Sequence, residues 1–234
     1  MKNKVVAIVL AAGQGKRMNS QVAKQYLHIK GKPLLYYTLQ AFEHSDVDEI
    51  ILVTGKGEEQ YCREQIIDYY SITKVKAIIP GGAERYDSVY QGLKACQETA
   101  FVLIHDGARP CITPQIINRT IEDVIKYEAC IVAVPVKDTI KKIDENGFVN
   151  ETLERNSLLI VQTPQAFSYS LISNAYDSIM HQEHQNITDD AMVVEAVTDT
   201  SIHVVEGSYC NIKVTTPEDL VVAERFLTKI ERYE

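Results

Sequence analysis

The chain has 234 residues, of which 45% are hydrophobic, and it carries a formal net charge of −8 at neutral pH. This length and composition allow a substantial buried core and predict a single α/β domain. The acidic balance argues against a nucleic-acid duplex as a partner, and the lack of an apolar run of about 18 residues argues against a membrane span.

The N-terminus begins with a basic segment followed by an apolar run from Val5 to Ala12, an order that signal peptides share. Gly13, Lys16 and Arg17 follow this short run at once. It therefore predicts a buried first strand that enters a loop, rather than a signal peptide.

Strands and helices are predicted to alternate along the next part of the chain. A short, β-branched apolar run predicts a strand, and apolar residues on one side of a helical repeat predict a helix. The predicted strands are Val5 to Leu10, Glu49 to Thr54, Val75 to Ile79, Phe101 to His105, and Cys130 to Val134. The predicted helices between them are Pro33 to Glu43, about 58 to 70, Arg85 to Cys96, and Pro114 to Tyr127. Because the strand runs are apolar throughout, they predict a mostly parallel sheet that helices cover on both faces.

The segment from Asp138 to Arg155 interrupts this alternation. Polar and charged residues flank the dipeptide Asn146-Gly147, which is typical of hairpins. Such residues do not suit a central strand, so the segment predicts a β-arm that projects from the sheet, with a surface hairpin as the alternative. The remaining predicted elements are strands near Leu159 to Gln162 and at Ile202 to Val205, and helices at Ser168 to Met180, Asp189 to Val197 and from Pro217.

The cysteines and histidines offer little support for disulfide or zinc chemistry. The five cysteines are widely spaced and include no Cys-x-x-Cys pair, so they predict a reducing, cytoplasmic environment. His181 and His184 lack the i, i+4 spacing of a zinc-binding helix.

A candidate nucleotide-binding loop, Leu10-Ala-Ala-Gly-Gln-Gly-Lys-Arg-Met18, follows the first strand. Small residues let backbone N–H groups approach phosphate oxygens closely. The loop residues that we expect to bind the nucleotide are Ala11, Ala12, Gly13, Gln14 and Gly15. Arg17 and Lys24 add cations that together suit a triphosphate. An ordinary turn and a solvated lysine are the alternatives. The loop matches neither the dinucleotide fingerprint nor the Walker motif.

A second glycine pair, Gly81-Gly82, follows the third predicted strand and precedes Ser88. In α/β proteins, ligands bind at the carboxyl ends of such strands. The backbone could therefore contact a base edge, with Ser88 adding a hydrogen bond. A tight turn followed by a helix cap explains the same residues equally well.

Asp106 directly follows the fourth predicted strand, in the sequence His105-Asp-Gly-Ala-Arg-Pro110. A carboxylate at the end of a buried strand is costly unless it binds something. The candidates are a magnesium ion, a ribose hydroxyl and the nearby Arg109, and a purely structural pair with Arg109 is the alternative. Lys213 lies between Ile212 and Val214 in a strand-like segment, so its side chain should point away from theirs.

The proposed cleft thus contains three cations, Arg17, Lys24 and Lys213, one carboxylate and no obvious nucleophile–base pair. Phosphoryl and nucleotidyl transfer requires this inventory, because it depends on positioning and on stabilising negative charge. A phosphate acceptor is mostly dianionic near neutral pH and needs no general base.

In this order, eight motifs resemble those of the 2-C-methyl-D-erythritol 4-phosphate cytidylyltransferases of the non-mevalonate isoprenoid pathway, over nearly the whole chain. They are LAAGQGKRM, AKQY, GGAERYDSV, HDGARP, PVKDTIK, TLERNSL, QTPQAF and EGSYCNIKVTTPEDL. The resemblance implies one Rossmann-like nucleotidyltransferase domain spanning residues 1–234, with CTP as substrate and Mg²⁺ as cofactor. It also implies a homodimer whose β-arms (residues 138–155) cross and complete each other's sites. Leu10 and Ala23 stand where the family usually has proline.

The resemblance also implies roles for individual residues. Arg17, Lys24 and Lys213 would stabilise charge on the phosphates during attack at the α-phosphorus. The residues that would hold the cytidine are Ala12, Gly13, Gly81, Gly82 and Ser88, and Asp106 would lie near the ribose and the metal, which it could contact indirectly. The residues around the acceptor would be Thr139, Arg155 and Thr163, with Arg109 close by and some of the set donated by the partner's arm.

Two other functions compete with this prediction. The similar ribitol 5-phosphate cytidylyltransferases use CTP on a related polyol phosphate, and they differ in sequence around the arm. A non-catalytic nucleotide-binding module is the second alternative, because fold alone does not determine activity. Such a module is expected to lack one or more of the three cations, all of which this chain has.

Overall fold

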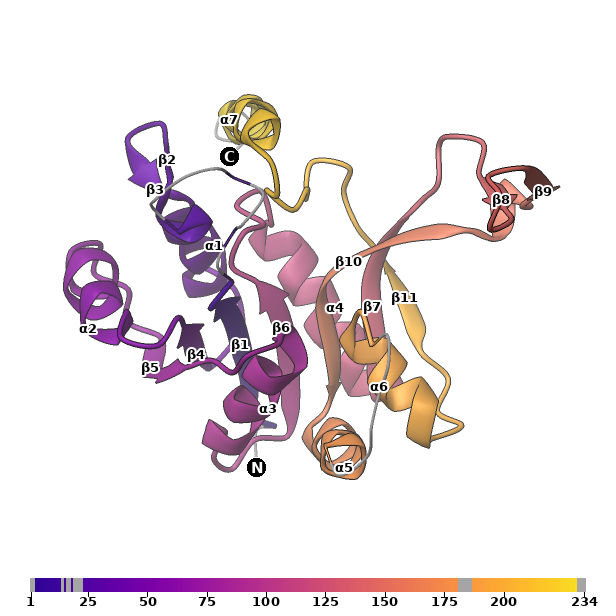
Figure 1. Cartoon of the computed structure of the whole chain (residues 1–234). Helices are drawn as coiled ribbons and strands as arrows, with labels where there is room; N and C mark the ends of the chain where they lie inside the picture. The colour runs from indigo at the N-terminus through magenta and orange to yellow at the C-terminus, as the bar shows by residue number, and fades with distance from the viewer. Residues whose placement is uncertain (1–2, 14, 16–17, 19–22, 181–186, 231–234) are drawn as a thin grey trace.

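A computed structural model describes residues 3–13, 15, 18, 23–180 and 187–230 (Figure 1). Its central sheet contains the strands β1 (Val5–Ala11), β4 (Glu49–Thr54), β5 (Val75–Pro80), β6 (Phe101–Asp106), β7 (Ala129–Pro135), β10 (Leu159–Ser168) and β11 (His203–Glu206). They lie in the order β11-β7-β10-β6-β1-β4-β5. Every neighbouring pair is parallel except those of β10, which runs antiparallel to both β6 and β7. The predicted mostly parallel sheet is confirmed.

Helices cover both faces of this sheet. They are α1 (Leu34–Glu43), α2 (Glu59–Cys62), α3 (Arg85–Ala95), α4 (Pro114–Tyr127), α5 (Tyr169–Ile179), α6 (Asp190–Val197) and α7 (Pro217–Ile230). Side chains of α1 and α4 pack in one hydrophobic core, and those of α3, α5 and α6 pack in a second core on the opposite face. Along β1, Ala7 and Val9 belong to the first core, while Val6 and Ile8 belong to the second. Burial on both faces explains why this strand is an unbroken apolar run.

Three differences from the predicted elements bear on the fold, and a fourth, around Lys213, belongs to the site described below. The predicted helix at 58–70 is α2 continued by a π-helical segment, Arg63–Asp68. A small hairpin of β2 (His28–Ile29) and β3 (Lys32–Pro33) was not predicted. β10 continues six residues past its predicted end at Gln162 and contains Pro164, with an irregular register between Val161 and Gln165. Proline cannot donate a ladder hydrogen bond, and an irregularity of this kind accommodates it.

The predicted arm is a two-stranded hairpin of β8 (Lys141–Ile143) and β9 (Val149–Thr152), which projects from the domain between β7 and β10 (Figure 1). All residues of both strands are exposed. Gly147 in the turn has a φ of 85°, a conformation that favours glycine.

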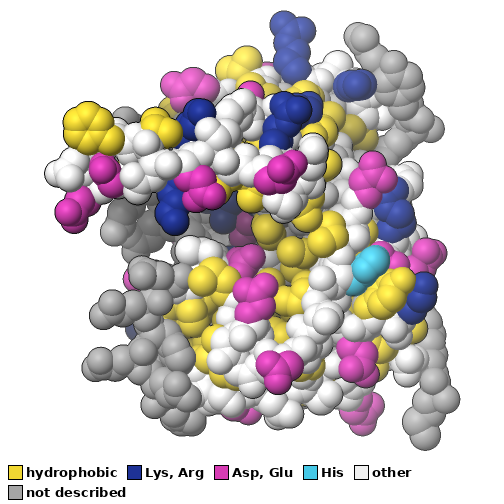
Figure 2. Space-filling model, turned by 90° about the vertical axis from the view of Figure 1, so that its right-hand side faces the viewer, with side chains coloured by type: hydrophobic (Ala, Val, Ile, Leu, Met, Phe, Trp, Pro, Cys, Tyr) yellow, Lys and Arg dark blue, Asp and Glu magenta, His cyan; other side chains and the backbone are white. Residues whose placement is uncertain are grey.

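Hydrophobic side chains gather beneath the arm on the face shown in Figure 2. The first three residues of β10, which lead from the arm into the sheet, remain largely accessible: Leu159 is 42%, Ile160 50% and Val161 40% exposed. Within the described ranges, no helix combines the length and the apolar character that crossing a bilayer requires.

Candidate functional site

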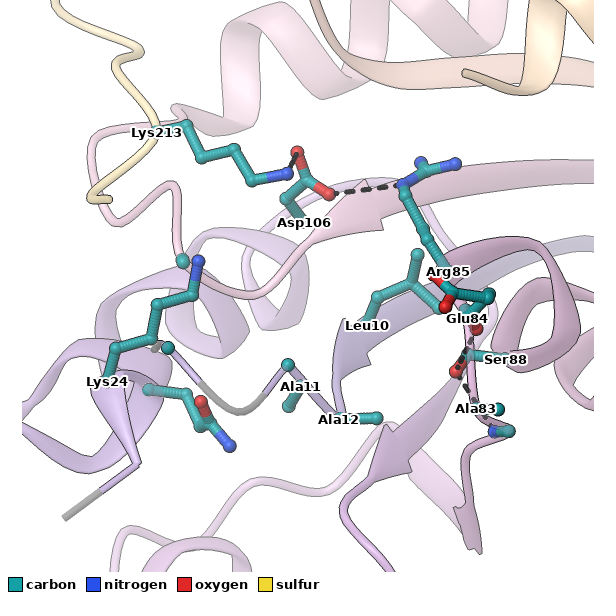
Figure 3. Close-up of a pocket in the computed structure, with 15 residues that line it drawn as sticks. Leu10, Ala11, Ala12, Lys24, Ala83, Glu84, Arg85, Ser88, Asp106 and Lys213 are labelled. Atoms are coloured by element: carbon teal, nitrogen blue, oxygen red, sulfur yellow. Dashed lines mark hydrogen bonds and ion pairs between the residues drawn. The ribbon is translucent and has the colours of Figure 1, made fainter. Parts of the chain in front are cut away.

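A cleft of about 440 Å³ lies where the loops after β1, β5 and β6 meet (Figure 3). This is the carboxyl edge of parallel strands, at the point where the chain has crossed to both sides of β1. The described residues that line the cleft are Leu10, Ala11, Ala12, Gly13, Gly15, Lys24, Gln25, Gly82, Ala83, Glu84, Arg85, Ser88, Asp106, Ala108 and Lys213. Its volume falls in the range typical of small-molecule sites.

The loop after β1 forms one wall of the cleft and supports Lys24. Gly15 has a φ of 62°, and a Cβ on it would lie 3.1 Å from the Cβ of Lys24. A glycine is therefore needed there for the lysine stem to cross the loop. The loop contributes Ala11, Ala12, Gly13 and Gly15 to the lining, as predicted. Gln14 and Arg17, also predicted, lie outside the described residues.

Lys24 and Lys213 come together although they are far apart in sequence. The Nζ of Lys24 lies 3.3 Å from the carbonyl oxygen of Val214, the residue after Lys213. Both side chains line the same cleft. Two of the three predicted cations therefore share one site.

The glycine loop after β5 packs directly against the loop after β1. A Cβ on Gly81 would lie 2.6 Å from that of Ala12, so the two backbones could not approach this closely with a larger residue. Ser88 braces the loop, since its Oγ accepts a hydrogen bond from the N–H of Gly82 at 3.1 Å and donates one to the carbonyl of Glu84 at 3.2 Å. Glu84 also caps α3 in a capping box. The turn-and-cap geometry is thus present, and it forms one side of the cleft.

Asp106 occupies the centre of the charged groups. Its Oδ2 lies 3.1 Å from the Nζ of Lys213 and 3.2 Å from the Nε of Arg109, and its Oδ1 lies 3.5 Å from the Nε of Arg85. Burial alone would raise the pKa of this carboxyl, but Lys213, Arg85 and Arg109 outweigh it and hold the pKa well below its usual range. Asp106 is therefore ionised, and the pair with Arg109 that the sequence suggested is observed.

We predicted that the segment around Lys213 is strand-like, but it is not part of a strand in the structure. It is attached to the loop after β6 instead. The N–H of Val214 donates to the carbonyl of Ala108 at 2.8 Å, and Nη1 of Arg109 donates to the carbonyl of Asn211 at 2.9 Å. These two bonds tie the segment to the loop after β6 without a partner strand, and they hold Lys213 beside Asp106.

Thr163 lies behind Asp106 rather than among the residues that line the cleft. It is 5% exposed, and its Oγ1 accepts a hydrogen bond from the N–H of Asp106 at 3.1 Å. The same oxygen lies 3.0 Å from Nδ1 of the fully buried His105. Burial lowers the pKa of His105 to about 3, so this imidazole is neutral. Thr163 thus helps to fix the backbone on which Asp106 is mounted.

Thr139 and Arg155 belong to the arm segment and do not line the cleft of their own chain. Both are exposed. Nη1 of Arg155 donates to the carbonyl of Lys137 at 3.0 Å. The fold therefore does not bring these two predicted residues to the other site residues within one chain.

Arg85 was missed by the sequence reasoning. It stands in the motif Gly-Gly-Ala-Glu-Arg, where a cation so close to a glycine loop is a usable signal. Its buried partner Asp190 lies 105 residues later. Nothing local in the sequence predicts that pairing.

The described part of the cleft combines cations, backbone amides and two carboxylates, Asp106 among the cations and Glu84 at the cap of α3. Its lining contains no cysteine or histidine, and no cluster of three or more metal-ligating side chains occurs among the described residues. Such a site can bind a polyanion and stabilise charge that develops on it, without forming a covalent bond to the protein.

Known proteins share this sequence and this fold. A sequence model of the family described as 2-C-methyl-D-erythritol 4-phosphate cytidylyltransferase matches residues 5–229. A protein of that name from Lachnoclostridium phytofermentans is 50% identical over 224 residues, covering 96% of each chain. The solved 4-diphosphocytidyl-2C-methyl-D-erythritol synthase from Anaerococcus prevotii matches with a TM-score of 0.86 at 34% identity, covering 97% of this chain and 96% of that one. The cytidylyltransferase structure from Thermus thermophilus gives a TM-score of 0.76 at 29% identity, covering 95% and 98%.

Proposed function

The chain belongs to the 2-C-methyl-D-erythritol 4-phosphate cytidylyltransferase family, and we propose that its cleft is where CTP is joined to that polyol phosphate. An oxygen of the acceptor phosphate forms a bond to the α-phosphorus of CTP. The bond from that phosphorus to the β-phosphate bridging oxygen breaks, and pyrophosphate leaves. The observation that carries the assignment is the convergence of Lys24 and Lys213 beside Asp106 in one cleft.

Catalysis here is stabilisation of charge. The acceptor phosphate is mostly dianionic near neutral pH, so it attacks without a general base. The positive charges of Lys24, Lys213 and Arg17 together balance the negative charge that builds up on the phosphates as the new bond forms. The proximity of Lys24 to Val214 supports these roles, because one bound triphosphate and acceptor could contact both lysines.

The cytidine is held where the two glycine loops touch. Gly81 packs closely against Ala12, and the next residue, Gly82, lines the cleft, where it can offer backbone groups to the edge of a base. Asp106 lies at the end of β6 on the side of the cleft that the ribose would occupy. A side chain at Gly81 would collide with Ala12 and Ser88, and one at Gly82 would collide with Asp87, so either would displace the loop that faces the base.

Magnesium would accompany CTP and neutralise charge on its phosphates. Both oxygens of Asp106 already face cations, namely Arg85 on one side and Arg109 with Lys213 on the other. A direct bond from Asp106 to the metal would have to displace them. The residues fit a metal held mainly by the triphosphate, with Asp106 acting indirectly.

The acceptor site is completed by a second copy of the chain. Thr139 and Arg155 are exposed on the arm and do not line the cleft of their own chain, and Arg109 pairs with Asp106 without lining the cleft itself. The accessible apolar residues Leu159 and Ile160 at the base of the arm suit an interface between subunits. A crossed homodimer would place each arm over the partner's cleft.

Mixing two inactive variants tests this arrangement. Arg155→Ala and Lys213→Ala homodimers are each expected to be inactive. If Arg155 acts in the partner's site, refolding them together should restore about a quarter of wild-type activity, since half of the random dimers have one intact site of two. In the control mixture, Arg225→Ala takes the place of Arg155→Ala and is refolded with Lys213→Ala. Arg225 is exposed and lies outside the cleft and the arm. No recovery in a mixture shown to exchange subunits would place Arg155 in its own chain's site.

The activity itself is tested by measuring pyrophosphate release from CTP with either polyol phosphate. We expect turnover with 2-C-methyl-D-erythritol 4-phosphate and little with ribitol 5-phosphate. Turnover with ribitol 5-phosphate alone would identify the other cytidylyltransferase, and nucleotide binding without turnover would identify a non-catalytic module. We also propose that the protein acts in the cytoplasm, which is supported by its five free cysteines.

A further inference from the structure

Arg85, the first residue of α3, connects two carboxylates that come from different parts of the chain. Its Nη1 and Nη2 donate to Oδ1 and Oδ2 of Asp190 at 2.8 and 2.7 Å. Its Nε points to Oδ1 of Asp106 at 3.5 Å, as Figure 3 shows. A planar guanidinium has donors in fixed directions, so it can bind one carboxylate in a bidentate manner and present a further N–H to another.

Asp190 is a rigid anchor for this guanidinium. It is fully buried and also accepts a hydrogen bond from the hydroxyl of Tyr176 at 2.7 Å. Its backbone N–H donates to Oε1 of Gln165 at 2.9 Å, and Gln165 is itself only 1% exposed. A buried carboxylate is stable only when it is paired and hydrogen-bonded. Arg85 is therefore held in one orientation from the side opposite the cleft.

This orientation determines how Asp106 presents its two oxygens. With Oδ1 facing Arg85, Oδ2 faces Lys213 at 3.1 Å and Arg109 at 3.2 Å. A carboxylate can otherwise rotate over a broad range about its terminal torsion. The contact from Arg85 restricts this rotation, and so fixes the position of Oδ2, to which the ammonium of Lys213 is attracted.

We propose that Arg85 is a positioning residue for cytidylyl transfer: anchored by Asp190, it orients the Asp106 carboxylate so that Lys213 meets the reacting phosphates. This role rests on the proposed function of the cleft. Arg85 acts through Asp106 and not on the substrate directly. Small displacements of a catalytic group reduce turnover strongly, because the group must meet the charge where it develops.

Two variants separate this role from the structural role of the buried pair. Arg85→Lys keeps one positive charge for Asp190 but lacks the Nε donor that faces Asp106. The double variant Arg85→Gln with Asp190→Asn replaces the ion pair with two neutral amides, so no buried charge is left unpaired. Tyr169→Phe is the matched control, because it removes the hydrogen bond from a tyrosine hydroxyl to the carbonyl of Leu93 in α3 without touching Arg85, Asp190 or Asp106.

The measurements are circular dichroism and thermal unfolding, followed by kcat and the KM for CTP with 2-C-methyl-D-erythritol 4-phosphate. In each folded Arg85 variant we expect kcat to fall about tenfold or more while the KM for CTP changes less than about threefold. Tyr169→Phe should lower the unfolding temperature and keep kcat within about twofold of wild type. If one Arg85 variant does not fold, the other decides. A folded variant with kcat within about twofold of wild type would overturn the proposal.

The pathway through Asp106 is tested on an Asp106→Asn background. There, adding Arg85→Lys should cause no further loss of kcat, because the orientation of the carboxylate no longer matters. A second loss of the same size would mean that Arg85 acts on the substrate, which would also overturn the positioning role. Wild-type enzyme serves in the same assay as the check on the proposed function: if it does not turn over, the function has failed, whatever the variants do.

Discussion

Replacing Lys24 with methionine tests whether a positive charge in the cleft stabilises the transition state. Methionine keeps an unbranched apolar stem to pack over Gly15, next to which the stem of Lys24 lies, and removes only the ammonium. The Nζ of Lys24 faces the cleft beside the carbonyl of Val214. The variant should therefore fold normally and lose activity.

The size of the loss follows from Coulomb's law. A unit charge on a phosphate about 4 Å from the ammonium interacts with it by about 1 kcal/mol in bulk water and by about 4 kcal/mol at an effective dielectric constant of about 20. The walls of the cleft exclude part of the water around Lys24, so we take about 3 kcal/mol. Removing one group that stabilises developing charge has a similar cost in other enzymes. This corresponds to a loss of about 100-fold in kcat/KM.

The assay follows pyrophosphate release at varied CTP and saturating acceptor. Lys76→Met removes a charge from an exposed side chain of β5, outside the cleft, and is the control for the change in net charge. We expect it to remain within about twofold of wild type. If folded Lys24→Met retains kcat/KM within about fivefold of wild type, Lys24 does not stabilise the transition state and the electrostatic reasoning is wrong.

Three further substitutions test other parts of the site. Gly81→Ala would place a Cβ 2.6 Å from that of Ala12 and force the two loops apart, so the KM for CTP should rise about tenfold or more in steady-state assays. His105→Gln should weaken the acid sensitivity of folding. The folded-state pKa of His105, about 3, lies below its ordinary 6.5, so the stability that it contributes is present above pH 6.5 and is lost as the pH falls toward 3. Between pH 6.5 and 4.5, urea unfolding should show that the variant loses less free energy of unfolding than wild type. The difference should be up to about 1.4 kcal/mol for each pH unit. Asp219→Ala removes the carboxylate that accepts hydrogen bonds from the N–H and Oγ1 of Thr215, so it should cost about 1–2 kcal/mol of stability and lower kcat by loosening the segment after Lys213.

Each of these three expectations has an outcome that contradicts it. An unchanged KM for CTP in Gly81→Ala would mean that the contact between the loops does not shape the nucleotide site. His44→Gln changes an exposed histidine and is the control for His105→Gln; equal slopes in both variants and in wild type would show that His105 does not set the acid sensitivity. Wild-type stability and kcat in Asp219→Ala would show that Asp219 does not hold the Lys213 segment.

Local patterns in the sequence predicted most elements because those elements are buried in a regular way. The strand Glu49–Thr54 and the helix Pro114–Tyr127 were predicted to the residue. The strand has an apolar run between its polar ends, and the helix begins at a proline after Thr113. β10 was predicted too short because Pro164 is an expected end of a strand. Only pairing with β6 and β7 on both sides, with an irregular register near the proline, keeps that strand continuous.

Within the site, the sequence identified the glycine loops and Asp106, because loops that follow apolar strands must meet at one edge of a parallel sheet. It placed Lys24 near the first loop because Lys24 follows Arg17 closely in sequence, and the role of Lys213 came from the family resemblance. It could not reveal that Asp106 faces three cations, or that Arg85 is held by Asp190, 105 residues away. Periodicity and turn signals report on neighbours within a few residues. Partners in a charge network depend instead on strand order and on how helices return to the sheet, and only the tertiary structure decides these.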